Sequence, residues 1–139
     1  MSLALVPPVA DADTAPSLRR RAAGPVAAAA LAVTSGAHIP VAIHHLHEVP
    51  YLGWLFCAFV AATSGGAAAL LVTDRRAVWQ LVGALNLGAI AVFVVSRLAG
   101  LPQASDDKGD WANPAALVCL GAQLVVVTVS CLVLRTSRR

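Results

Sequence analysis

Charged residues are scarce in this sequence. Of its 139 residues only 12% are Asp, Glu, Lys or Arg, about half the share in a typical soluble domain. These charges gather in short clusters between long uncharged runs. Because a charged side chain at the centre of a bilayer costs several kcal/mol, this spacing is typical of a membrane protein and argues against a soluble domain. The formal net charge of +3 is also too small to indicate nucleic-acid binding.

Aromatic residues (5%) and cysteines are scarce as well. The three cysteines are Cys57, Cys119 and Cys131. They lie inside apolar runs, and no CxxC or other zinc-binding spacing is present. We therefore interpret them as small hydrophobic residues. Cys57 and Cys119 have similar predicted depths in the membrane, but this does not predict a disulfide.

The chain has four apolar runs of the length that a bilayer requires, about 20 residues for a helix. Helices are expected because backbone groups cannot stay unpaired in lipid. The predicted fold class is all-α, a transmembrane four-helix bundle. We predict a disordered tail at 1–23, a four-helix domain at 24–135 and a basic tail at 136–139. The predicted helices cover residues about 24–47, 51–73, 77–98 and 112–134.

The basic residues predict the orientation, since Lys and Arg favour the cytoplasmic side of a membrane. Four crossings would put both termini and the turn at 74–76 on one side. That side carries eight of the ten Lys and Arg residues, and Arg97 and Lys108 lie on the other. The sequence thus predicts a multi-pass protein of the cell membrane with both termini in the cytoplasm. Trp54 and Trp111 would anchor the outer interface and Trp79 the inner one.

A second interpretation of the first apolar run remains open. Three arginines, an apolar stretch and the Ser35-Gly36-Ala37 segment resemble a secretory signal with a cleavage site. Cleavage would leave three helices. Against it, the preceding tail is long for a signal, and apolar residues continue through Ile43.

Helix packing in lipid relies on small and polar residues. Small-xxx-small pairs occur at Ala32/Gly36, Ala62/Gly66 and Ala84/Gly88. Polar residues recur near mid-bilayer, and they include Thr34, Ser35, Ser64, Asn86 and Gln123. They predict either an interhelical hydrogen-bond belt or a polar path for a substrate. No Asp, Glu or Lys lies in the middle of a run, which argues against a proton-coupled transporter.

All four histidines lie within ten positions, and Glu48 follows them. In a helix that continues to residue 47, His44, His45, His47 and Glu48 stand three or four positions apart in pairs, so such pairs share a face. Imidazole and carboxylate suit a transition metal such as zinc, copper, nickel or iron, which is the candidate cofactor, and contact with a haem belongs to the same interpretation. A polar interfacial turn and a pH sensor are the alternatives.

His38 and Arg97 need separate interpretations. His38 lies about 10 Å deeper than His45, too far for one ion to bridge them. We expect it to bond a neighbouring helix or a water, near the backbone carbonyl that Pro40 leaves free. Arg97 lies on the side that basic residues avoid. It is expected to pair with Glu48 or a loop aspartate, or to extend to the interface.

Several residues together resemble a pattern in small, uncharacterised four-helix membrane proteins of actinobacteria. They are His38, His45, Glu48, Gly53, Asn86-Leu87, Ser96-Arg97 and Gly100-Leu101-Pro102. The resemblance covers roughly residues 30–113 and implies that His38, His45, Glu48, Asn86 and Arg97 are the residues to test first. Small multidrug exporters and dihaem membrane cytochromes fit less well. The former need a carboxylate within the first helix, and the latter need histidines on facing helices.

These patterns rank the functional hypotheses. The first is an accessory or metal-contacting component of a membrane complex, whose partners are the lipid bilayer and a larger complex or an identical copy. Its candidate metal ligands are His44, His45, His47 and Glu48. The second is a small transporter or channel that uses the mid-bilayer belt. A membrane enzyme is the least favoured, because no catalytic arrangement of side chains is evident. Polar residues of structural or functional interest are His38, Asn86, Arg97 and Gln123.

Overall fold

The computed structural model describes residues 18–103, 105 and 107–136, which form four helices and no β-strand. The helices are α1 (Leu18–Glu48), α2 (Pro50–Val72), α3 (Arg76–Leu98) and α4 (Pro114–Thr136). Each is long and apolar enough to cross a membrane, which confirms the all-α fold class and the four predicted spans. Helix α1 begins inside the segment for which the sequence predicted a tail, because Leu and Arg at 18–21 are good helix formers. Residues 1–17 and 137–139 lie outside the described residues.

Proline and asparagine mark the beginnings of two helices. Only Val49 separates α1 from α2, and Pro50 takes the first position of α2, where no backbone N–H is needed. Helix α4 begins with Pro114. The Asn113 Oδ1 accepts hydrogen bonds from the backbone N–H groups of Ala115 and Ala116, at 3.1 and 3.2 Å. Asn113 therefore caps α4.

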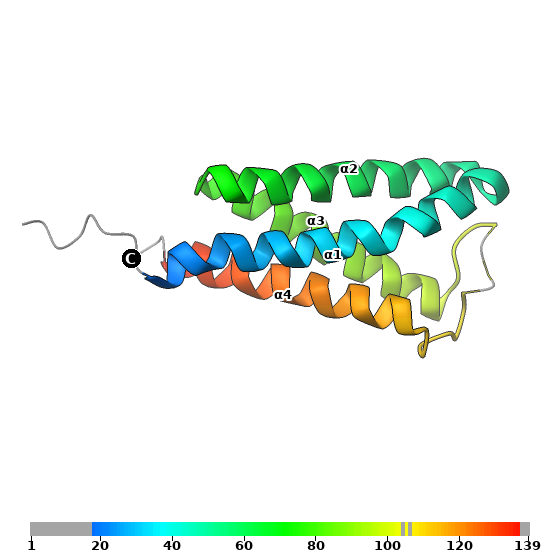
Figure 1. Ribbon diagram of the computed structural model, residues 1–139. Helices are drawn as coiled ribbons and strands as arrows, with labels where there is room; N and C mark the ends of the chain where they lie inside the picture. Colours follow the sequence, from blue (N-terminus) through cyan, green and yellow to red (C-terminus); the bar gives the residue numbers. More distant parts are fainter. Residues whose placement is uncertain (1–17, 104, 106, 137–139) are drawn as a thin grey trace, which may run out of the picture.

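The four helices run up and down as antiparallel neighbours (Figure 1). Helix α1 packs most extensively on α2 and also contacts α4, which in turn packs on α3. Among the helix pairs in contact, α2 and α3 touch least, although they follow each other in the chain. Beyond Pro40, which removes one helical hydrogen bond, α1 leans toward α2 (Figure 1). We call the end with the α1–α2 connection the elbow end, and the opposite end, with the α2–α3 turn, the turn end.

The packed core lies in the half of the bundle nearer the turn end. It contains Ala27, Leu31, Leu70, Trp79, Val82, Val126 and Val133. Trp79 is only 2% exposed, and its indole N–H donates to Asp74 Oδ1 at 2.8 Å. The expectation that Trp79 anchors the membrane interface is therefore wrong, because its ring closes the core beside the α2–α3 turn. Trp54 and Trp111 are exposed near the elbow end, at 69% and 45%.

One of the three small-xxx-small pairs brings helices together. A Cβ on Gly66 would lie 2.7 Å from Val82 Cγ1, so this glycine permits the approach of α2 to α3. Gly36 and Gly88, from the other two pairs, have open space where a Cβ would stand. Those two pairs consequently face away from the bundle.

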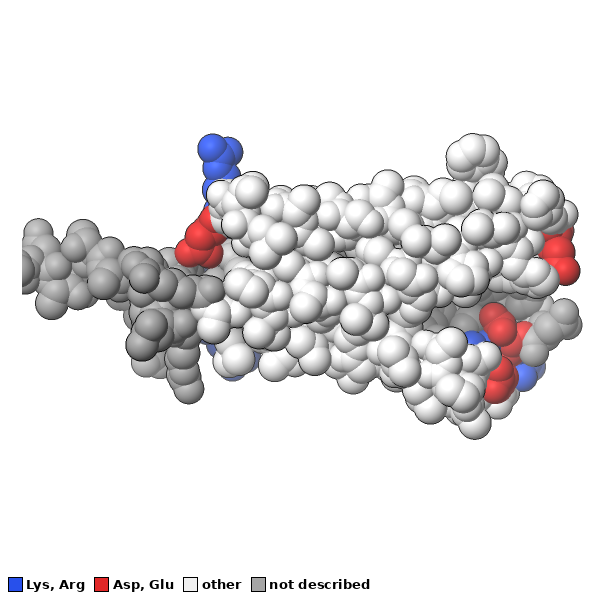
Figure 2. Space-filling model, viewed as in Figure 1, with Lys and Arg blue, Asp and Glu red and all other residues white. Residues whose placement is uncertain are grey.

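The charged side chains that the structure describes lie at the two ends of the bundle. Figure 2 shows basic (blue) and acidic (red) side chains at both ends of the visible face and none along its middle. This division agrees with the sequence, in which 50–73 and 112–134 contain no charged residue. A central belt free of charge is what the hydrocarbon core of a bilayer requires.

Candidate functional site

The elbow end depends on a close approach of α1 and α2 at Gly53. A Cβ on Gly53 would lie 2.5 Å from the backbone nitrogen of Leu46 and 2.6 Å from its Cα. Because backbone atoms cannot move aside as a flexible side chain can, the position requires glycine. This contact holds the end of α1, where residues 44–48 include three histidines and Glu48, against the first turn of α2.

Three side chains at that end of α1 lie close enough together to hold a metal ion. One ligand atom each from His44, His45 and Glu48 lies within 4.8 Å of the other two. His44 Nε2 lies 2.9 Å from Glu48 Oε2, and the two side chains are 65% and 59% exposed. His47, the fourth predicted ligand, is exposed and does not belong to the group. Among the described residues, no other group of three or more His, Cys, Asp or Glu side chains meets this distance.

His45 is the least exposed of the three. Its ring stacks on Phe56 of α2, with centroids 5.5 Å apart and planes 17° from parallel. Its Nδ1 atom is buried and has no hydrogen-bond partner. The Phe56 ring thus fixes the orientation of the imidazole, while the side chains of His44 and Glu48 are exposed.

The donor set is one that metals use in proteins. Two imidazoles and one carboxylate bind zinc in sites that keep an open coordination position, and they also bind non-haem iron. Structural zinc sites, in contrast, have four protein ligands. The exposed group at the elbow therefore fits an exchangeable metal with a coordination position open to water or a partner.

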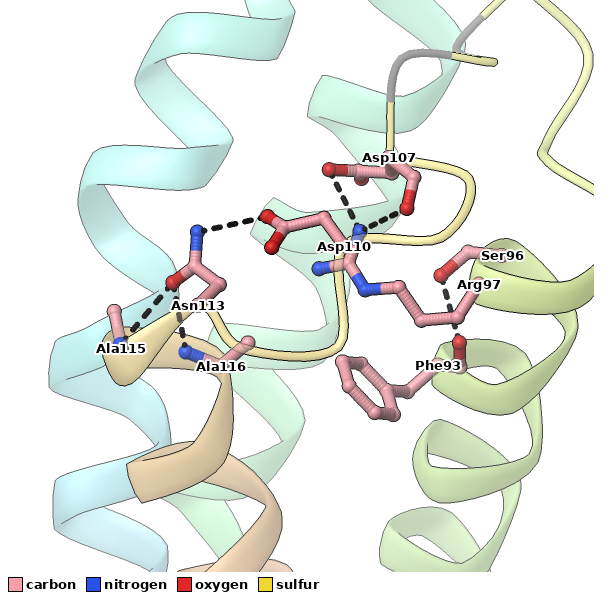
Figure 3. Close-up of polar contacts among 8 residues, drawn as sticks. All are labelled: Phe93, Ser96, Arg97, Asp107, Asp110, Asn113, Ala115 and Ala116. Atoms are coloured by element: carbon pink, nitrogen blue, oxygen red, sulfur yellow. Dashed lines mark hydrogen bonds and ion pairs between the residues drawn. The ribbon is translucent and has the colours of Figure 1, made fainter.

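The connection between α3 and α4 folds over the elbow end through Arg97 (Figure 3). The Arg97 side chain is 6% exposed, and its Nη1 lies 2.8 Å from both Asp107 Oδ1 and the Asp107 carbonyl oxygen. The guanidinium carbon lies 5.0 Å from the centre of the Phe93 ring. Of the predicted partners of Arg97, the structure selects a loop aspartate and not Glu48.

Two further contacts fasten the same connection. The Tyr51 hydroxyl at the start of α2 donates to the Pro102 carbonyl. The Trp111 ring meets Phe93 edge to face, with centroids 6.1 Å apart. The α3–α4 connection is therefore attached to both α2 and α3. Tyr51 links it to the first turn of α2, which follows His44, His45 and Glu48 in the chain.

His38 contacts neighbouring helices deeper in the bundle. Its Nδ1 lies 2.8 Å from the Thr34 carbonyl oxygen and 3.3 Å from the Sγ of Cys119 on α4. The rings of Phe56 and Phe59 flank it, with centroids 5.5 and 4.9 Å away. The sequence interpretation of Cys119 as a hydrophobic residue missed this contact. The available signal was depth, since the sequence puts both Cys119 and His38 about 10 Å below the predicted outer surface.

The mid-bilayer belt divides into separate parts. Ser35 Oγ lies 2.7 Å from Thr63 Oγ1, and Ser64 Oγ donates to Ser35 Oγ at 3.3 Å, so hydroxyls join α1 to α2. Asn86 is fully buried and bonds within its own helix, from Nδ2 to the Val82 carbonyl at 2.8 Å. Gln123 is 4% exposed on α4.

No protein-family model, curated protein or solved structure matches this chain. The resemblance to small actinobacterial membrane proteins thus stays a prediction. What the chain does must be argued from its own geometry.

Proposed function

We propose that this chain is a small multi-pass integral membrane protein that receives a divalent transition-metal ion at His44, His45 and Glu48. The observation that carries the proposal is the mutual approach, within 4.8 Å, of one ligand atom from each of the three residues. Three atoms this close need only small side-chain rotations to lie about 2.0–2.2 Å from a shared ion. The residues lie at the elbow end, where the chain is exposed.

The orientation follows from the arginines. The turn end carries Arg75, Arg76 and Arg135, and α1 begins there with Arg19, Arg20 and Arg21 in its first turn. By the preference of basic residues for the cytoplasmic side, the turn end is cytoplasmic and the elbow end faces outward. The metal would then be taken up on the extracytoplasmic face of the cell membrane.

An accessory role in a larger membrane complex, or in an assembly of identical copies, suits an open three-ligand site. The protein supplies three ligands, and a partner side chain or a water completes the coordination. Such a site releases its ion more readily than a closed four-ligand site does. The proposal therefore assigns the chain to metal contact and transfer, without a chemical reaction.

Metal binding by the purified protein tests the proposal. After loading with Zn²⁺ and removal of free ion, the wild type should retain one ion that His44→Ala and Glu48→Gln lose or bind at least about tenfold more weakly. His47→Ala is the matched control, since this exposed histidine belongs to the same turn but not to the group. Equal retention by His44→Ala and the wild type would leave the His44–Glu48 contact as an ordinary i,i+4 ion pair and end the proposal.

A second candidate function, a small channel or transporter, is favoured by two buried polar atoms. Asn86 Oδ1 on α3 and Ser130 Oγ on α4 have no hydrogen-bond partner. Unpaired polar atoms in a helical bundle are costly and can mark a path for a polar solute. Solute uptake or conductance in proteoliposomes that falls with Asn86→Leu or Gln123→Leu would support this candidate, and unchanged fluxes would remove it.

A further inference from the structure

His38 and Cys119 bring two metal-binding side chains together from different helices, well below the elbow. His38 lies about 15 Å along α1 from Glu48. Its Nδ1 is 3.3 Å from the Cys119 Sγ on α4, and Cys119 is only 8% exposed. This pair shares no residue with the group of His44, His45 and Glu48 at the elbow end, so the proposed metal site there gives no role to His38 or Cys119.

A third potential ligand completes a triangle with the pair. The Thr34 carbonyl oxygen lies 2.8 Å from His38 Nδ1 and 3.9 Å from Cys119 Sγ. With the 3.3 Å between sulfur and nitrogen, these distances define a triangle whose centre is about 2.0 Å from each corner. Metal–nitrogen and metal–sulfur bonds in proteins measure about 2.0–2.3 Å. An ion at this centre would fit with small adjustments of the two side chains.

The surroundings decide which ion the triangle suits. Phe56 and Phe59 flank His38 with apolar ring surface. Between 22 and 47, 50 and 73, and 112 and 134 the sequence contains no Asp, Glu, Lys or Arg. An uncompensated charge at this depth is costly. A monovalent cation bound to one thiolate leaves the site neutral, whereas a divalent cation leaves it with one positive charge.

We propose that His38 and Cys119 form a buried site for a soft monovalent metal ion, Cu(I) or its analogue Ag(I). The Thr34 carbonyl is a weaker third ligand, because carbonyl oxygen suits harder ions. Thiolate sulfur selects such ions over harder ones. Binding forms a bond from the ion to Sγ and releases the thiol proton to water. The imidazole hydrogen, which Nδ1 now donates to the Thr34 carbonyl, moves to Nε2 so that Nδ1 can bind the ion. The imidazole stays neutral, and the net charge of the site does not change.

The position of His45 suggests how an ion enters. Phe56 lies between the two sites, since its ring stacks on His45 at 5.5 Å and lies 5.5 Å from His38. The Nδ1 atom of His45 is buried and has no hydrogen-bond partner, so it is free to bind an ion. A rotation of the Phe56 side chain would open a path along which an ion could pass from His45 to His38.

Silver binding tests the buried site in a background that removes the other thiols. The chain has three cysteines, so the Cys57→Ser/Cys131→Ser variant leaves Cys119 as the sole thiol. This variant, purified in detergent, should retain one Ag(I) against a competing thioether. X-ray absorption should find one sulfur and two nitrogen or oxygen neighbours. Adding Cys119→Ser should abolish retention, and adding His38→Ala should weaken it at least about tenfold.

The outcomes separate this site from the one at the elbow. His44→Ala with Glu48→Gln should leave the silver at the buried site, so the two proposals can fail independently. Thermal unfolding of each variant reports whether it is folded. Failure of the folded parent variant to retain silver, or equal retention after His38→Ala, would overturn the proposal. If the parent variant retains no silver, the contact of Cys119 with His38 only holds helices together. If retention is equal after His38→Ala, the Cys119 thiol binds silver without the histidine.

Discussion

Arg97 Nη1 lies 2.8 Å from two oxygens of Asp107, one from the carboxylate and one from the backbone. Arg97 is 6% exposed at the end of α3, whereas the Asp107 side chain is 49% exposed in the connection to α4. A guanidinium buried to this degree needs its partners, because an unpaired buried charge is costly. The contact therefore fixes the connection over the elbow end of the bundle.

Arg97→Gln should release this connection. The loss of two charge-assisted contacts with a partly exposed aspartate should cost about 1–2 kcal/mol of local stability. Lys108 follows Asp107 and is the chain's sole lysine. Trypsin should therefore cut after Lys108 about five to thirty times faster in the variant, a rate that a time course analysed by mass spectrometry measures.

Arg135→Gln is the control for that experiment. This arginine lies in the last turn of α4 at the turn end, so its replacement should leave the cleavage rate unchanged. Equal rates for wild type and Arg97→Gln would mean that other contacts, such as the one from Tyr51 to the Pro102 carbonyl, hold the connection without Arg97.

The sequence predicted the helices well and their faces poorly, for one physical reason. Length and hydropathy define a span in lipid, so all four helices could be located. Their apolar residues surround the whole helix, however, because lipid and protein interior are similarly apolar. The pattern therefore could not tell that Trp79 points inward or that Gly36 and Gly88 point outward.

In the candidate site, too, contacts within one helix could be predicted from the sequence, whereas contacts between different elements could not. The spacing of His44 and Glu48 at i, i+4 predicted their 2.9 Å contact, since helical geometry alone decides it. The partner of Arg97 depended on how the α3–α4 connection folds. From the sequence alone, Glu48 and the loop aspartates were equally plausible partners of Arg97. The contact of His38 with Cys119 depended on the rotation of α4, which hydropathy does not encode.

Gly66→Ala should loosen the junction of α2 and α3. The new Cβ would lie 2.7 Å from Val82 Cγ1, and such overpacking costs about 1–3 kcal/mol. Gly65→Ala is the matched control, because its Cβ would meet open space. Unfolding in detergent should therefore begin at a lower temperature for Gly66→Ala than for Gly65→Ala. Equal midpoints would show that α2 shifts at no cost, as its sparse contact with α3 would allow.

Lys108 also reports the orientation of the protein in the membrane. It is the sole lysine and is exposed in the connection at the elbow end. If that end faces outward, an amine reagent that cannot cross membranes should label Lys108 in intact cells, as peptide mass analysis would detect. Labelling that occurs only after the membrane is permeabilised would reverse the orientation and move the elbow group to the cytoplasmic side.

Asn86→Leu should leave the stability of the bundle unchanged or raise it by about 1–3 kcal/mol. Asn86 is fully buried, and its Oδ1 has no hydrogen-bond partner. Leucine has a similar size and removes the unpaired oxygen, at the loss of one bond within the helix to the Val82 carbonyl. Asn86→Asp is the contrasting variant and should destabilise the protein strongly, since it buries a carboxylate. Thermal unfolding of both variants in detergent measures these effects.

A loss of stability in Asn86→Leu would have a specific meaning. It would require a partner for Oδ1 in the assembled protein, such as a water or a second copy of the chain. Asn86→Leu analysed by native mass spectrometry then separates the two, because only an inter-chain bond changes the oligomeric state. If the variant keeps its stability but loses solute flux in proteoliposomes, Asn86 serves transport. If stability and flux both stay as in the wild type, the asparagine has no part in a polar path, and metal contact at the elbow remains the function that the side chains support.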